Sequence, residues 1–360
     1  MEQLTPEISV IMAVHNGEKF LQYTVDSILK QSFTSFELIV IDDASTDSTP
    51  DILKRYAASD HRICIVTNEE NLRLARSLNK GLELARGKYI VRMDADDICL
   101  PERFERQYRF MEENSDIDVS SCKYFTLNDG AVTPCVMGRR CDGESIKAMF
   151  LFFCPILHPG VIAKAEVLKR YRYDPLHTCS EDLDLWTRMI ADGVRFACSG
   201  DYLMLYRIHK NSITRSTADK QKVEVLQSER AYYSAMLSGL PSNEEDFYIN
   251  GVYFRHGGDL KHFFRFYKFI ITENRKKGLF KKSAVVSATA EVLAEYNRNF
   301  KMGLFGKLYM LRFGGFTFLS ELKARKKQSK KDIAAAEMSA RQADLERVTG
   351  DVLTYKFLER

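Results

Sequence analysis

Four short apolar runs alternate with helical patterns over the first hundred residues, and this alternation limits the possible folds more than any other feature. A run that is apolar at nearly every position is typical of a strand buried on both faces of a parallel sheet. The runs occupy residues 8–14, 36–41, 63–66 and 89–91, and a helical pattern from about residue 75 to residue 86 precedes the last of them. The pattern predicts an α/β fold built on a doubly wound, mostly parallel sheet.

Three carboxylates, Asp94, Asp96 and Asp97, follow the fourth run closely. Because burying an unpaired carboxylate costs on the order of several kcal/mol, we expect them just past the end of the strand, where open α/β sheets bind ligands. Asp94 and Asp96 are two positions apart, so in an extended chain their side chains point the same way. Such a pair suits Mg²⁺ or Mn²⁺ carrying a diphosphate, although a D-x-D alone is also compatible with a solvated acidic loop.

Polar residues follow the other runs as well, among them Asn16, Asp43 and Asn71. Together with the acidic triplet they indicate a nucleotide-binding crevice at one edge of the sheet. The chain has no G-x-G-x-x-G after the first run and no G-x-x-x-x-G-K-[ST]. Dinucleotide-binding and P-loop chemistry are therefore disfavoured.

Residues 8–17, 37–49, 71–81 and 87–101 resemble the inverting, nucleotide-sugar-dependent glycosyltransferases with the GT-A fold, the family 2 glycosyltransferases. The V-x-N-G, D-D-x-S-T-D and D-A-D-D motifs of that family fall at residues 14–17, 42–47 and 94–97. The resemblance covers about the first 215 residues in consistent order. The sequence Ala-Val-His at residues 13–15 departs from the family, which more often has a proline and a tyrosine there; this bears on nucleotide stacking rather than on class.

The resemblance implies a donor site with a divalent metal, Mn²⁺ or Mg²⁺. Asp96 would be the principal metal ligand, and His209 would be a second ligand or, as a cation, approach the diphosphate. Asp94 would meet the ribose or the metal, and Asp43 would accept a hydrogen bond from a uracil-type base. The residues expected to bind substrate on this basis are Val14, Asn16, Asp43, Asn71, Arg73, Asp94, Ala95, His158, Glu181 and Arg207.

The segment that follows Ser180 holds the expected catalytic residue. Glu181 and Asp182 favour the first turn of a helix, where carboxylates interact well with the backbone dipole, and capping alone accounts for the composition. Inverting sugar transfer also needs a base that takes the acceptor hydroxyl proton. The aspartate of the family's E-D segment supplies this base, and it falls on Asp182. His158 would lie near the sugar on the acceptor side; a His-Pro turn that satisfies a local carbonyl is the alternative.

Three hypotheses for function remain open on the sequence. The first is a non-processive glycosyltransferase that moves a sugar, most often from a UDP-sugar, to a glycan or lipid-linked acceptor, as in bacterial surface polysaccharide synthesis. The absence of the Q-x-x-R-W segment of processive relatives favours a single transfer. The others are a metal-dependent nucleotidyltransferase, disfavoured because no Gly-rich basic loop follows the first run, and a non-catalytic nucleotide-sugar binder.

Residues 255–331 carry 19 Lys and Arg against 5 Asp and Glu, although the net charge of the whole chain is only +4. Cations alternate with aromatics at 263–271 and 303–313, which indicates a small helical bundle or a helix on an anionic membrane; nucleic acid is disfavoured. The eight scattered cysteines, the lack of a signal peptide and the lack of a long apolar run predict a cytoplasmic protein, with peripheral membrane contact as an option. We expect a catalytic domain at 1–215, a basic helical region at 216–331 and a charged helix at 332–360.

Overall fold

The computed structural model describes residues 5–128, 131–135, 142–209, 218–237, 260–300 and 354–355. The strands are β1 (Ile8–Val14), β2 (Phe36–Asp42), β3 (Ile63–Thr67), β4 (Tyr89–Asp94), β5 (Ile98–Cys99), β6 (Val119–Asn128), β7 (Ala131–Pro134), β8 (Ile162–Lys164), β9 (Phe196–Ile208) and β10 (Thr354–Tyr355). The helices are α1 (Leu21–Leu29), α2 (Thr49–Ser59), α3 (Arg73–Leu84), α4 (Arg103–Glu113), α5 (Gly143–Met149), η1 (His158–Gly160), α6 (Ala165–Tyr171), α7 (Glu181–Ala191), α9 (Ala218–Leu237), α11 (Leu260–Lys277) and α12 (Lys282–Phe300).

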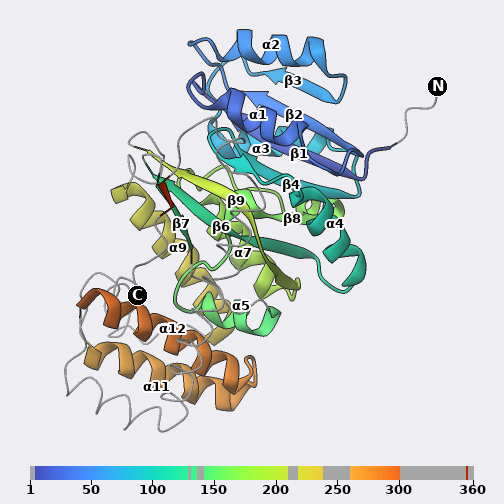
Figure 1. Cartoon of the computed structure of the whole chain (residues 1–360). Helices are drawn as coiled ribbons and strands as arrows, with labels where there is room; N and C mark the ends of the chain where they lie inside the picture. The colour runs from blue at the N-terminus through green and yellow to red at the C-terminus, as the bar shows by residue number, and fades with distance from the viewer. Residues whose placement is uncertain are drawn as a thin grey trace. The chain divides into compact units, whose positions relative to one another are not determined.

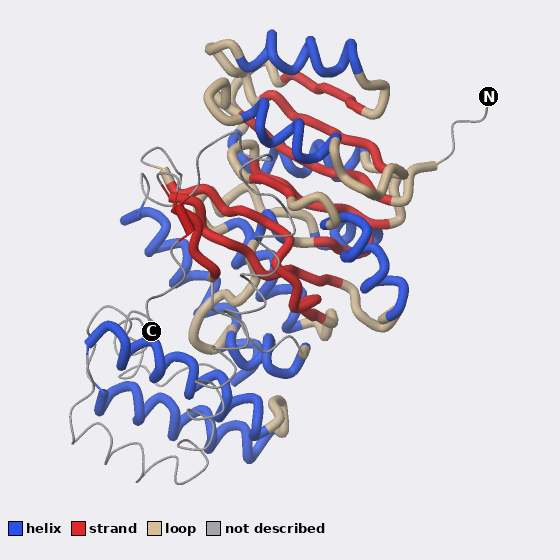
Figure 2. The backbone as a smooth tube through the Cα atoms, in the orientation of Figure 1, coloured by secondary structure: helices blue, strands red, loops and turns tan. Residues whose placement is uncertain are grey.

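The four predicted apolar runs are confirmed as β1 to β4, and they form the parallel half of the sheet in the order β4-β1-β2-β3. The other half is mixed. Strand β8 pairs antiparallel with both β4 and β6, and β9 pairs parallel with β6. Figure 2 shows these strands together with the helices that accompany them. Because β1, β2 and β4 are parallel, their carboxyl ends, and the polar residues that follow, share one edge of the sheet.

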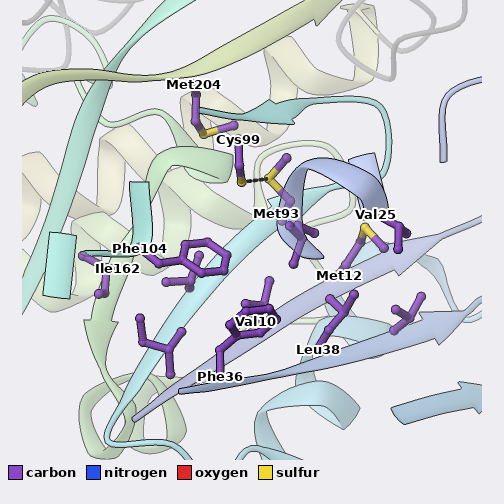
Figure 3. Close-up of a cluster of buried hydrophobic side chains, with 14 of the residues drawn as sticks. Val10, Met12, Val25, Phe36, Leu38, Met93, Cys99, Phe104, Ile162 and Met204 are labelled. Atoms are coloured by element: carbon purple, nitrogen blue, oxygen red, sulfur yellow. Dashed lines mark hydrogen bonds between the residues drawn. The ribbon is translucent and has the colours of Figure 1, made fainter. Parts of the chain in front are cut away.

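Alternate residues of β1 serve two cores, which explains why the run is apolar throughout. Val10 and Met12 belong to the cluster that includes Val25 of α1, shown in Figure 3. Ile11 faces α3 instead: a Cβ built on Gly81 of that helix would lie 2.5 Å from Ile11 Cγ2. Glycine at this position therefore permits the close approach of α3 to the strand.

The chain divides into two compact units, and each is described by itself. The first comprises residues 1–135, 156–225 and 335–360 and contains the sheet (Figure 1). The second comprises residues 136–155 and 226–334, so the segment 136–155, which the sequence places inside the first domain, groups with the later helices. The boundaries expected from the sequence stay a proposal.

The aromatic side chains of α11 lie inside the second unit. Phe263, Phe264 and Phe266 are buried, and the rings of Phe263 and Phe266 pack on Phe152, with centroids 5.9 Å apart in both pairs. For this segment the helical-bundle interpretation is the one that fits. The second aromatic and cationic segment, 303–313, lies outside the described residues.

Thr354 and Tyr355 pair with β7 as strand β10, so the helix expected over 332–360 does not include them. A β-branched and an aromatic residue favour a strand where an edge is available for pairing. The rest of that range lies outside the described residues. Among the helices that the structure describes, none has the length and apolar character needed to cross a membrane.

Candidate functional site

The three carboxylates that follow the fourth run lie together. One carboxylate oxygen each from Asp94, Asp96 and Asp97 is within 4.8 Å of the others. Asp94 is the last residue of β4, and the chain turns at Ala95 and Asp96. The turn therefore creates the cluster, and the expectation of an extended chain through Asp94 and Asp96 is wrong.

Asp97 is fully buried and does not cap the next helix, whose N-cap is Glu102. Its Oδ1 accepts a hydrogen bond from Arg207 N at 2.8 Å, whereas Oδ2 has no hydrogen-bond partner among the described residues. Burial, and then the charges of Asp96 and Asp94, raise the pKa of Asp97 well above its usual value. A buried, unpartnered carboxylate oxygen beside two further carboxylates is a donor set that fits a divalent cation.

The two predicted metal ligands are in contact across the sheet edge. His209, which follows β9, lies with Nε2 2.8 Å from Asp96 Oδ2. Arg207 donates from Nε to Asp96 O at 2.9 Å. The ring of Phe20 packs against both, 5.0 Å from the His209 ring and 4.5 Å from the Arg207 guanidinium. The residues at the ends of β4 and β9 thus form one polar cluster, which consists of Asp94, Asp96, Asp97, Arg207 and His209.

Asp43 organises a second group, after β2 and β3. Its Oδ1 accepts hydrogen bonds from Asn68 Nδ2, Leu72 N and Ser77 Oγ at 2.7, 2.8 and 3.0 Å, and its Oδ2 accepts one from Arg73 N at 2.9 Å. Asp43 therefore holds the loop before α3, and its contact with a base stays a prediction. Asn68 and Ser77 were not singled out in the sequence because their partner is more than twenty positions away.

Three further residues that were predicted to bind the nucleotide-sugar lie around that group. Val14 is the last residue of β1, and its carbonyl oxygen accepts a hydrogen bond from Asp43 N at 2.8 Å. Asn16 is occupied with the loop after β2, because its Oδ1 accepts Thr46 N at 2.8 Å. Asn71 Oδ1 accepts Arg73 N at 3.1 Å. Asn16 thus links the loops after β1 and β2, and Asp43 and Asn71 both accept a hydrogen bond from Arg73 N.

Arg73 adopts φ +67°, in the left-handed region that favours glycine. We therefore expect Arg73→Gly to raise the free energy of unfolding by about 1 kcal/mol, because a non-glycine residue pays roughly that amount there. Arg73→Ala keeps the strain and is the matched control. Urea unfolding of the three proteins measures the difference; equal stability of the glycine and alanine variants would contradict the expectation.

The predicted catalytic residue, Asp182, and the predicted substrate-binding residue Glu181 lie at the start of α7. Ser180 occupies the N-cap position but makes no side-chain capping bond, and Glu181 and Asp182 lie in the first turn of the helix. Glu181 is only 7% exposed, and burial, with the Asp182 charge second, raises its pKa to about 8. Burial also raises the pKa of Asp182, whose Oδ1 accepts Leu183 N at 2.8 Å. Burial thus favours the protonated form of both carboxyls.

His158 lies beside this pair, with Nδ1 3.9 Å from Glu181 Oε1. Its Nε2 is 2.8 Å from the hydroxyl of Tyr173, so the imidazole is not used in the local turn. Burial, and then the charge of Arg92, lower the pKa of His158 well below its usual value, which keeps the ring neutral. The structure therefore places His158 beside Glu181, and the acceptor-side role of His158 stays a prediction.

Arg92 joins the two halves of the site, and the sequence analysis did not single it out. Its side chain is buried in β4, and Nη1 contacts Asp94 Oδ2 at 2.5 Å. Its charge also lowers the pKa of both Glu181 and Asp182. A signal was present, because a charged residue inside an otherwise apolar buried strand must be paired.

The chain is similar to known proteins, both in sequence and in structure. The family model described as glycosyl transferase family 2 matches residues 9–149. An uncharacterised glycosyltransferase of Methanocaldococcus jannaschii is 37% identical over 221 residues, which is 61% of this chain and 76% of the relative.

Two solved structures are similar over most of the chain. Residues 1–349 of S. aureus TarS in complex with UDP-GlcNAc match with a TM-score of 0.56 and 19% identity, over 81% of this chain and 89% of that one. A mannosyltransferase of Pyrobaculum calidifontis in complex with GDP-Man and Mn²⁺ matches with a TM-score of 0.50 and 17% identity, over 94% of this chain and 88% of that one. The GT-A fold expected from the sequence is confirmed.

Proposed function

The chain belongs to glycosyl transferase family 2, and from this premise we propose that it is an inverting, non-processive enzyme that transfers one sugar from a UDP-sugar to a glycan or lipid-linked acceptor. As a glycosyltransferase it is neither a nucleotidyltransferase nor a mere binder. One observation carries the proposal: the acidic turn and the Glu181–Asp182 pair lie around the same buried arginine, Arg92.

Asp182 is the proposed base. Its carboxylate takes the proton of the acceptor hydroxyl while that oxygen bonds to the anomeric carbon, the bond from this carbon to the diphosphate oxygen breaks, and the nucleoside diphosphate leaves. Attack opposite the leaving group inverts the configuration. Burial raises the pKa of both neighbouring carboxyls and the charge of Arg92 lowers both, so electrostatics do not separate them. The base is assigned to Asp182 because the aspartate of the family's E-D segment falls there.

Asp96 and His209, with Asp94 and Asp97 beside them, are the residues that would hold a divalent metal. The metal supplies charge neutralisation for the departing diphosphate. Arg207, fixed against Asp96 and Phe20, adds a cation at the same place. Support for the metal comes from this donor set and from the Mn²⁺ in the structure of the mannosyltransferase.

The acceptor and the location of the protein are proposals that rest on the sequence. The missing Q-x-x-R-W segment supports a single transfer, as in bacterial surface polysaccharide synthesis. The excess of Lys and Arg in residues 255–331 supports peripheral contact of a cytoplasmic protein with an anionic membrane. The buried aromatics of α11 do not contribute to such a contact.

A panel of nucleotides and sugar donors tests the donor assignment by thermal shift, with Mn²⁺ and with a chelator. We expect UDP and one UDP-sugar to raise the melting temperature only with Mn²⁺, because ligands that bind only the folded state stabilise it. The carboxamide in Asp96→Asn removes a charged metal ligand and should abolish the Mn²⁺-dependent shift. Stabilisation by GDP instead of UDP would overturn the uracil assignment; a metal-independent shift would overturn the metal site.

A further inference from the structure

Helix α1 carries a buried polar stripe that neither the motifs nor the proposed roles explain. Thr24, Ser27 and Gln31 are spaced i, i+3 and i+7, so they lie on one side of the helix and its continuation. Their exposed fractions are 0%, 4% and 4%. Buried polar side chains need partners, so the stripe must be bound to something.

Each residue of the stripe binds the backbone of residues 95–104, which begin within the acidic turn and continue beyond it. Thr24 Oγ1 lies 2.9 Å from Ala95 O and 2.8 Å from Asp97 O. Ser27 Oγ accepts Cys99 N at 3.1 Å. Gln31 donates from Nε2 to Leu100 O at 2.7 Å and accepts Phe104 N through Oε1 at 3.0 Å.

These contacts hold a segment that has little regular structure of its own. Strand β5 is only two residues long, and Asp96 and Asp97 precede it in a turn. The two carbonyl groups that flank Asp96 converge on the single hydroxyl of Thr24. That hydroxyl has one hydrogen to donate, so the two carbonyl oxygens share it. The hydroxyl thereby limits the distance between the two carbonyl groups.

The same helix also meets the other metal-side residues. Phe20, directly before α1, packs against the His209 ring and the Arg207 guanidinium. Helix α1 therefore contacts both strand ends that supply the metal ligands.

We propose that the α1 stripe is the positioning element of the metal site, with Thr24 as the residue that sets the geometry of the Asp94–Asp97 turn. Thr24 acts through the backbone and touches neither metal nor substrate. The inference rests on the proposed function, because it assumes that the turn binds a divalent cation.

The test is Mn²⁺ titration of the full chain by electron paramagnetic resonance, without donor or acceptor. Thr24→Val keeps the shape of the side chain but removes the hydroxyl, and Thr24→Ser keeps the hydroxyl. Thr289→Val is the matched control, because Thr289 is also fully buried in a helix and donates to Val285 O of the same helix at 2.7 Å. We expect Mn²⁺ affinity to fall at least about tenfold in Thr24→Val, as for partners of metal ligands generally, and to stay near wild type in the other two.

Hydrogen exchange of the amides in residues 94–100 gives a second readout, which should be faster in Thr24→Val alone. Should that variant fail to fold, Ser27→Ala replaces it, since it removes the bond to Cys99 N. Wild-type affinity and exchange in Thr24→Val would overturn the inference and leave the proposed function standing. Absence of Mn²⁺ binding by the wild type would overturn the metal assignment and the inference with it.

Discussion

Asp182→Asn is expected to lower kcat by about a thousandfold, within the range found when a general base is removed. The carboxamide cannot take the acceptor proton, yet it has the size of the carboxylate and its oxygen can still accept Leu183 N. Donor affinity should therefore remain within a few-fold of wild type. Release of nucleoside diphosphate measures turnover, and the thermal shift with donor and Mn²⁺ measures binding.

Asp192→Asn is the matched control for this prediction. Asp192 is the C-cap residue of the same helix, is exposed, and accepts a hydrogen bond from the Tyr171 hydroxyl at 3.0 Å. We expect it to leave turnover unchanged. Near wild-type turnover in Asp182→Asn would contradict the assignment of the base and would direct attention to Glu181.

Arg92→Met is expected to lower the free energy of unfolding by about 3–5 kcal/mol, the usual cost of removing one partner of a buried ion pair. The substitution leaves Asp94, Glu181 and Asp182 without their buried cation. Arg195→Met is the control, because Arg195 pairs with Asp116 on the surface and should cost about 1 kcal/mol or less. Urea unfolding measures both.

The loss in Arg92→Met should be larger at pH 8 than at pH 5.5. Without the arginine charge, the pKa values of Glu181 and Asp182 rise further in the folded state. When the pKa of a carboxyl is higher in the folded than in the unfolded state, the free energy of unfolding falls as the pH rises toward the folded-state pKa. The reason is that the carboxyl ionises more readily in the unfolded chain. An equal loss at both pH values, or a loss no larger than in Arg195→Met, would contradict the role given to Arg92.

The parallel half of the fold was predictable because a strand buried on both faces must be apolar almost throughout. Residues 8–14 and 36–41 carry that requirement openly, and each strand ends within a few residues of its prediction. The mixed half was not predictable, since β6, β8 and β9 pair over large sequence separations that local patterns do not record.

The candidate site was predictable as a set of residues rather than as a geometry. Motifs identified Asp96, His209 and Asp182, and the structure places the first two in contact. The polar spacing of Thr24, Ser27 and Gln31 was visible too, but the same spacing is typical of a solvated helix face. Only the fold shows that the face meets Ala95, 71 positions away.

The configuration of the product tests the account most directly. Once a donor and an acceptor are identified, proton NMR of the product distinguishes an α from a β linkage at the transferred sugar. An α-linked donor should give a β-linked product, because Asp182 activates the acceptor for one displacement opposite the leaving group. An α-linked product would require two displacements and would contradict both the inverting mechanism and the role of Asp182.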